Sequence, residues 1–104
     1  MIDTTVTEIV VSEFKPGIDF DEQFRLSSLI NKAALNFPGF LSRDVYYTEE
    51  TKKWIEVINW ESKEKASEAL KISKTCPICN EVFQQLNGDT MLFMYAESVI
   101  SFNE

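Results

Sequence analysis

The sequence predicts an α+β domain of the ferredoxin-like type, in which a four-stranded antiparallel sheet carries both helices on one face. Three observations support this prediction. Strand-like and helix-like segments follow one another in the order β-α-β-β-α-β. With 104 residues, 44% of them hydrophobic, the chain has the size of one compact core, so residues 1–104 are expected to form a single domain. The predicted third and last strands are apolar on both faces.

The first strand and the first helix are predicted from β-branched content and helical spacing. Residues 6–14 are rich in Val and Ile and end at a Lys-Pro-Gly turn, which is typical of a strand. A helix follows, with Asp19 or Asp21 as its N-terminal cap and with Pro38 and Gly39 ending it. Its apolar residues recur three and four positions apart, which predicts one buried stripe. The stripe comprises Phe20, Phe24, Leu26, Leu29, Ile30, Ala33 and Phe37.

A β-hairpin and a second helix are predicted next. Phe40–Thr48 and Lys53–Trp60 alternate with a period of two and are joined by a short polar connection. Ser62 can cap a helix whose buried face carries Ala66, Ala69 and Leu70.

The final third of the chain predicts a broken helix and a last strand. The helix is expected to break before Pro77, where Thr75 or Cys76 can cap a further segment. Residues 90–100 alternate in an apolar pattern and are predicted to be the last strand. The apolar face of the segment after Pro77 comprises Cys79, Val82, Phe83 and Leu86.

Composition disfavours several classes of partner. The net charge of −7 is spread along the chain and the basic residues form no cluster, so neither nucleic acid nor a membrane surface is an expected partner. No apolar run approaches the roughly 18 residues of a membrane span, and the first residues do not resemble a signal peptide, so a cytoplasmic protein is expected. The chain has no histidine, the commonest metal ligand and the usual proton shuttle near pH 7. We expect no metal and no cofactor.

The apolar second face of the sheet predicts a homodimer. In the third strand Trp54, Ile58 and Trp60 share one face, whereas Ile55 and Val57 occupy the other. Helices cover only one face of such a sheet, and soluble monomers rarely expose an apolar patch of more than a few hundred Å². Two sheets packed face to face would bury the second face. The alternative is that the C-terminal tail or a loop covers it.

Both cysteines lie in one Cys-x-x-Cys motif, Cys76 and Cys79. Cys79 shares its helical stripe with apolar residues, which is typical of a small buried core residue. Cys76 lies at a helix start, where the pKa of a thiol can fall, so a reactive thiol or a reversible disulfide is the alternative. We expect Cys76 to be accessible to modification and Cys79 to be protected. Zinc is disfavoured because two thiolates supply only half of the usual four ligands.

Aromatic residues suggest a binding site for a planar organic ligand. Large rings with a polar tip provide stacking and oriented hydrogen bonds. Ordinary core and dimer packing is the alternative role for these rings. The candidate substrate-binding residues are Trp54, Trp60, Tyr47 and Tyr95.

Two charged residues are the catalytic candidates. Glu56 shares a strand face with the two tryptophans and is either a solvated carboxylate or a buried acid able to deprotonate a phenol. Arg43 could pair with Glu56 or stabilise a substrate anion.

Residues 37–47 and 52–70 resemble the antibiotic biosynthesis monooxygenase (ABM) family of dimeric α/β barrels. The shared pattern is Pro-Gly-Phe leading into a strand, a hairpin, and a strand that ends in Trp-x-Ser-x-x-x-Ala, here Trp60, Ser62 and Ala66. The resemblance implies dimerisation through the sheets. Some members oxidise polycyclic aromatic phenols with O2 and no cofactor, and others degrade heme. The heme branch uses a histidine and a first-strand asparagine that this chain lacks, which disfavours heme even though Trp60 matches a pocket tryptophan of that branch.

Two functions therefore follow as hypotheses. The first is a cofactor-independent monooxygenase, or a related small-molecule enzyme, acting on an aromatic or polycyclic substrate. The second is a non-enzymatic dimeric module that binds a ligand or another protein, since fold alone does not determine function.

Overall fold

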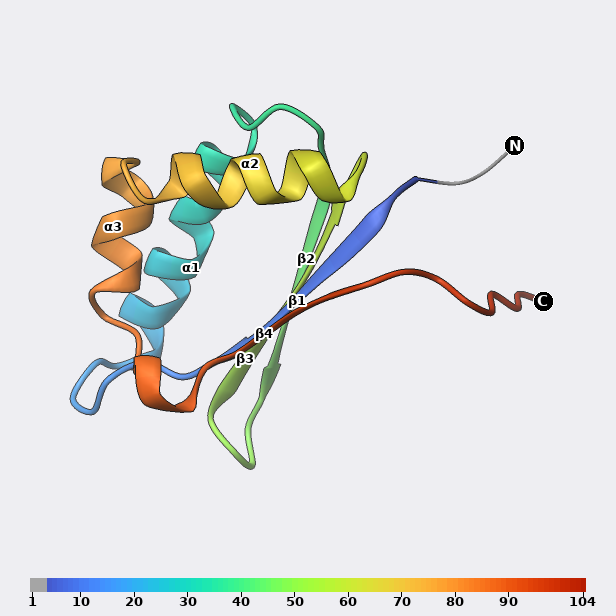
Figure 1. The fold of residues 1–104 in the computed structure, drawn as a ribbon. Coiled ribbons are helices and arrows are strands. Elements are labelled where there is room, and N and C mark those ends of the chain that lie inside the picture. Colours follow the sequence, from blue (N-terminus) through green and yellow to red (C-terminus); the bar gives the residue numbers. More distant parts are fainter. Residues whose placement is uncertain (1–3) are drawn as a thin grey trace.

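The computed structural model of the protein describes residues 4–104. Within that range the chain forms the expected ferredoxin-like α+β fold, including the helical segment expected after Pro77, and a 3-10 turn precedes the last strand (Figure 1). The elements are β1 (Val6–Ser12), α1 (Phe20–Ala34), β2 (Phe40–Thr48), β3 (Lys53–Trp60), α2 (Lys63–Ser73), α3 (Pro77–Phe83), the 3-10 turn η1 (Gly88–Thr90) and β4 (Leu92–Ala96).

The four strands form one antiparallel sheet in the order β2-β3-β1-β4. Figure 1 shows the sheet almost edge-on, with all three α-helices on one side of it. The register places Val10 of β1 opposite Glu56 of β3 and Phe93 of β4, so these three side chains lie on the same face. No helix within residues 4–104 is both long and apolar enough to cross a bilayer.

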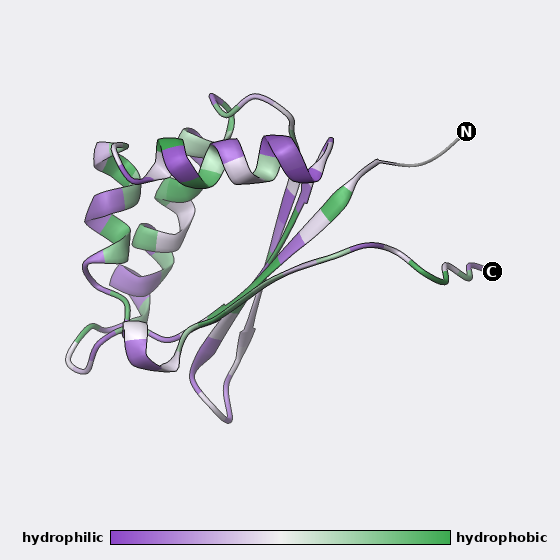
Figure 2. Cartoon of the chain, viewed as in Figure 1, coloured by the Kyte–Doolittle hydropathy of each residue, from purple (hydrophilic) through white to green (hydrophobic). Residues whose placement is uncertain are grey.

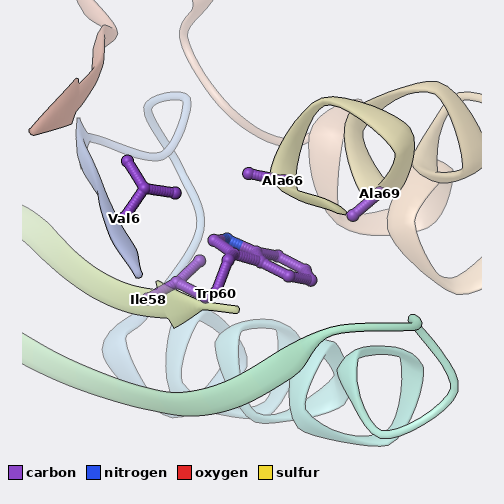
Figure 3. Close-up of a cluster of buried hydrophobic side chains, with 5 residues drawn as sticks. All are labelled: Val6, Ile58, Trp60, Ala66 and Ala69. Atoms are coloured by element: carbon purple, nitrogen blue, oxygen red, sulfur yellow. The ribbon is translucent and has the colours of Figure 1, made fainter. Parts of the chain in front are cut away.

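The best-packed part of the core lies where α2 crosses the sheet. Figure 3 shows Trp60 and Ile58 of β3 and Val6 of β1 beneath Ala66 and Ala69 of α2. Because alanine side chains are small, α2 can approach the sheet closely and pack against the indole of Trp60. This packing confirms that Trp54, Ile58 and Trp60 face the helices, as all three are buried there.

The helix caps match the sequence pattern. Asp19, rather than Asp21, caps α1 and accepts a hydrogen bond of 2.9 Å from the backbone N–H of Glu22. Ser62 caps α2 and accepts one of 3.2 Å from the N–H of Lys65. The expected break before Pro77 is confirmed, because Cys76 is the N-cap of α3 and Pro77 occupies its first turn.

The last strand is shorter than the predicted span of 90–100. Its first residue, Thr90, belongs to η1, Met91 is the C-cap of that turn, and pairing with β1 runs only from Leu92 to Ala96. β1 likewise ends at Ser12 rather than at Phe14, and Phe14 makes a single bridge to Leu86. An alternating apolar pattern indicates strand conformation but not whether a neighbouring strand is long enough to pair with it.

The predicted stripe on α1 is wrong at its N-terminal end. Phe20 and Phe24 are exposed, whereas Leu26 and Ala33 are buried. The buried side of α1 is therefore turned away from Phe24. Phe20 instead stacks on Trp54, with ring centroids 5.6 Å apart.

The second face of the sheet, which we call the outer face, carries no helix and no tail within residues 4–104. Figure 2 shows hydrophobic colour where β1 and β4 run together and hydrophilic colour toward the β2–β3 hairpin. The C-terminal tail leaves the end of β4 and extends beyond the sheet (Figure 1), and Val99, Ile100 and Phe102 are 90%, 86% and 92% exposed. The alternative in which the tail covers this face is therefore wrong. The apolar residues of the outer face are Ile9, Val11, Ile55, Val57, Leu92 and Met94.

Gly39, at the start of β2, provides a test of the contact between the α1–β2 turn and α2. Its φ is +84°, and a Cβ atom there would lie 2.5 Å from Cβ of Lys65. Gly39→Ala should therefore combine backbone strain with a clash and lower the free energy of unfolding by about 2 to 4 kcal/mol in urea titrations.

Gly17→Ala is the matched control, because Gly17 has a φ of +93° but open space around its Cβ position. Only the backbone strain remains there, so a loss of about 1 to 2 kcal/mol is expected. Equal losses in the two variants would contradict a steric role for the contact with Lys65.

Candidate functional site

A cavity of about 230 Å³ lies between the sheet and the helices. Its floor is the helix-facing side of β1 and β3, and α1, α2 and α3 all contribute to the opposite wall. Leu70 of α2, Phe83 of α3 and Phe93 of β4 line the cavity and are also exposed to solvent. The cavity therefore opens to solvent beside these three residues.

Glu8 is one of two carboxyl groups in the floor of the cavity, and Glu56 is the other. Strand alternation turns its side chain toward the helices, between the inward-facing Val6 and Val10. The indole N–H of Trp60 donates a hydrogen bond of 3.1 Å to its Oε1. Burial raises the pKa of Glu8 from 4.5 to about 7, and the charge of Glu56 adds to the effect, whereas the Trp60 hydrogen bond opposes it. Glu8 can therefore gain or lose a proton near neutral pH.

Arg43 and Glu56 form a buried ion pair beside Glu8. Nη2 and Nε of Arg43 lie 2.7 and 3.0 Å from Oε1 of Glu56, and the two side chains are 3% and 17% exposed. The guanidinium also donates to Oδ1 of Asn31 at 2.8 Å and to Oγ of Ser27 at 3.2 Å. Arg43 thus connects β2 to β3 and to α1, and its charge is matched inside the cavity wall.

The two carboxyl groups occupy opposite electrostatic environments. Glu56 is held by a guanidinium, whereas Glu8, among the residues that the structure describes, accepts from the neutral indole of Trp60 and faces the charge of Glu56. Such a difference between neighbouring carboxyl groups is common where one works as an acid or base and the other remains charged. The pairing of Arg43 with Glu56 is one of the two roles considered for Arg43 from the sequence.

The four aromatic candidates occupy different places. Trp54 and Trp60 both line the cavity. Tyr47 does not; its ring packs on Trp54, with centroids 4.9 Å apart. Tyr95 is packed against the core cluster beneath α2 and also lies outside the cavity lining. The structure thus brings Trp54, Trp60, Arg43 and Glu56 together around the cavity.

Tyr95 nevertheless lies near enough to Glu8 for the two side chains to influence each other electrostatically. The two residues are direct partners in the β1–β4 register. Burial, and then the nearby Glu8, raise the pKa of Tyr95. Its hydroxyl is buried with no hydrogen-bond partner among residues 4–104, which is an unfavourable state for a polar group.

Sequence reasoning missed Glu8. The available signal was its position at the centre of a β-branched strand, two residues from an inward-facing valine on either side. A carboxylate on the buried face of a strand is uncommon unless it is paired or functional. Among residues 4–104, no group of three or more acidic, cysteine or histidine side chains is placed to hold a metal ion.

Comparison with solved structures shows what this architecture is similar to. No protein-family model matches the chain, and no curated protein matches its sequence. SnoaB, a cofactor-independent oxygenase from Streptomyces nogalater, superposes with a TM-score of 0.74 at 13% identity, over 97% of this chain and 99% of its own.

Two further structures extend the likeness. A proposed antibiotic biosynthesis monooxygenase from Bordetella bronchiseptica gives a TM-score of 0.72 at 13% identity, over 93% of this chain and 99% of its own. Rv0793 from Mycobacterium tuberculosis gives 0.68 at 14%, over 95% and 99%. At these identities the likeness establishes an ABM-like fold, in agreement with the resemblance seen in the sequence.

The raised pKa of Glu8 predicts that stability falls as the pH rises from about 4.5 to about 7. Within this window the unfolded chain has lost the Glu8 proton while the folded chain keeps it, so the free energy of unfolding decreases with pH, by at most about 1.4 kcal/mol per pH unit from this residue. Urea titrations across the window should show a smaller decrease for Glu8→Gln than for the wild type. Glu64→Gln, on the exposed side of α2, should follow the wild type; if Glu8→Gln does so too, Glu8 is not the responsible group.

Proposed function

We propose that the protein is a small-molecule oxygenase that oxidises a phenolic aromatic compound with O2 and without a bound cofactor. The observation that carries this proposal is a titratable carboxyl group, Glu8, inside an aromatic-lined cavity. The fold shared with SnoaB, itself a cofactor-independent oxygenase, supports the reaction class. The volume of about 230 Å³ favours a compact planar substrate, because sites for drug-sized ligands usually measure roughly 300 to 1,000 Å³.

Glu8 would act as the general base. In its ionised form it takes the proton of the substrate hydroxyl, which leaves a phenolate and a neutral carboxyl group. Because the pKa of Glu8 is about 7, a substantial share of the protein is ionised at neutral pH, and the base is stronger than an ordinary carboxylate. Trp60 donates to Oε1 of Glu8 and would keep the carboxyl group oriented through this proton transfer.

The electron-rich phenolate would then react with O2. For an anthrone-like substrate, one oxygen atom becomes the new ring carbonyl and the other leaves as water, while the ring carbon loses two hydrogen atoms and four electrons. The substrate supplies every electron, so the protein has to position the reactants and exclude bulk water. Trp54 and Trp60 provide flat apolar walls for this purpose.

Arg43 and Glu56 would have a positioning role. The Arg43 guanidinium is already neutralised by Glu56, so the pair adds little net charge to the cavity. Their hydrogen bonds to Asn31 and Ser27 fix α1 over β2 and β3 and thereby fix the cavity wall. Loss of either partner would leave an uncompensated buried charge, which is strongly destabilising.

We also propose that the protein acts as a homodimer joined through the outer faces of two sheets. Cross-strand rows such as Leu92, Val11 and Ile55 form a contiguous apolar surface that no element within residues 4–104 covers. At one end of this face, Asn59 accepts from Thr7 at 2.7 Å and donates to Ser42 at 2.9 Å. These polar groups are satisfied within one chain and could be buried at low cost.

Oxygen consumption with a panel of anthrone-like and hydroquinone-like compounds tests the oxygenase. We expect turnover that needs no added cofactor, with kcat/KM rising from acidic pH toward a plateau and a midpoint near pH 7, because the ionised form of Glu8 is the active one. Glu8→Gln should lower kcat by roughly 10²- to 10⁴-fold. Glu64→Gln should leave the rate unchanged.

The outcomes separate the two functions inferred from the sequence. Tight binding of several panel compounds without oxygen uptake would contradict the oxygenase and favour the ligand-binding module. If the Glu8→Gln variant keeps its turnover and its pH profile, the oxygenase proposal stands but Glu8 is not the general base.

Sedimentation equilibrium tests the dimer. The wild-type chain should have a dimer mass at micromolar concentration, and Val57→Asp should shift it toward the monomer, because a charge would be placed in the interface beside Asp44, the β2 partner of Val57. Val57→Thr keeps the β-branched shape without a charge and should remain largely dimeric. A wild-type monomer would contradict the dimer.

A further inference from the structure

The Cys-x-x-Cys motif plays no part in the function proposed above, yet the fold places one of its two thiols in the cavity wall. Cys79 is 2% exposed and lines the cavity together with Val82 of the same helix. Cys76 is the residue just before α3 and is partly exposed. One thiol is therefore open to solvent while its neighbour forms part of the cavity wall.

The backbone holds the two cysteines in a fixed relation. The carbonyl of Cys76 accepts from the N–H of Asn80 at 2.9 Å, and the N–H of Cys76 donates to the carbonyl of Ser73 at 3.2 Å. Pro77 further restricts the turn between the two thiols. Residues three apart in a helical turn lie on the same side, at a separation from which a disulfide needs only a small adjustment.

The surroundings of the two sulfur atoms shift the pKa values of the two thiols in opposite directions. Partial burial works against ionisation of Cys76, but the Cys79 backbone N–H, the Cys79 thiol and the Ile78 N–H outweigh it and lower the pKa of Cys76. The Cys76 side chain does not make a regular N-capping hydrogen bond to α3. Burial, and then the neighbouring Cys76, raise the pKa of Cys79. Cys76 is thus the better nucleophile, and Cys79 remains a thiol.

We propose that Cys76 and Cys79 form an oxidisable dithiol site whose substrate is a small thiol oxidant such as hydrogen peroxide. In the first step the Cys76 thiolate attacks the peroxide; an S–O bond forms, the O–O bond breaks and hydroxide leaves, so Cys76 becomes a sulfenic acid. In the second step the Cys79 sulfur attacks Cys76; the S–S bond forms, the S–O bond breaks and water leaves. Two thiols and one peroxide give one disulfide and two waters, and an added dithiol reverses the oxidation.

Oxidation at this site would alter the cavity itself. The sulfur of Cys79 lines the wall, and in a disulfide it must lie within about 2.05 Å of the sulfur of Cys76. Formation of the bond therefore draws one wall atom toward the N-terminal end of α3. This inference concerns the thiols alone and does not depend on the oxygenase proposal.

Intact-mass spectrometry of the native protein, treated with hydrogen peroxide and then alkylated, tests the site. The wild type should lose two hydrogen atoms and take up no alkyl group, and dithiothreitol should restore both alkylation sites. Cys79→Ser should stop at a sulfenic acid on Cys76 that dimedone traps. Cys76→Ser should react at least about tenfold more slowly with peroxide, because the remaining thiol is buried and protonated.

Circular dichroism of the two serine variants controls for folding, and both should match the wild type. Faster modification of Cys79 than of Cys76 would overturn the assignment of the nucleophile. Conversion of wild-type Cys76 to a sulfinic acid without a disulfide, or a disulfide that links two chains, would overturn the dithiol site.

Discussion

The ion pair between Arg43 and Glu56 joins the sheet to α1 and brings the charge of Glu56 close to Glu8. Its guanidinium connects β2 and β3 to α1 through Asn31, which fixes the wall above the sheet. The carboxyl group of Glu56 lies near enough to Glu8 that its charge adds to burial in raising the pKa of Glu8. The ion pair thus joins a helix to the sheet, and its acidic partner also raises the pKa of a second acid in the same cavity.

The two faces of the sheet differ in how their apolar side chains are used. On the helix-facing side, the small residues Ala66 and Ala69 bring α2 onto Trp60, whereas α3 packs mainly on α1 and leaves room for the cavity. On the outer face the cross-strand rows are as apolar as an interior but lie open to solvent. The close packing beneath α2, the adjoining cavity and the uncovered second face all follow from three helices lying on one side of four strands.

Much of the fold could be predicted because it depends on periodicity. The alternation in β2 and β3 and the cap at Ser62 were sufficient for those elements. The end of β4 and the orientation of Phe24 were not predictable, since both depend on which neighbours are present rather than on local pattern. At the site, strand alternation was enough to suggest from the sequence that Arg43 could pair with Glu56, and the structure contains this pair. Glu8 was missed because a single acidic residue in a strand does not reveal which face is buried.

This chain and SnoaB share a fold at 13% identity over nearly the whole of SnoaB, so the fold constrains the sequence only loosely. The fold needs apolar alternation, a few caps and small residues under α2, and many sequences satisfy those needs. The cavity constrains the sequence more tightly than the fold does. Burying a carboxyl group such as Glu8 is unfavourable, and the cost is reduced here because Glu8 can be protonated near neutral pH and accepts a hydrogen bond from Trp60. Function in this chain therefore has to be argued from Glu8 and its surroundings, which the fold accommodates but does not dictate.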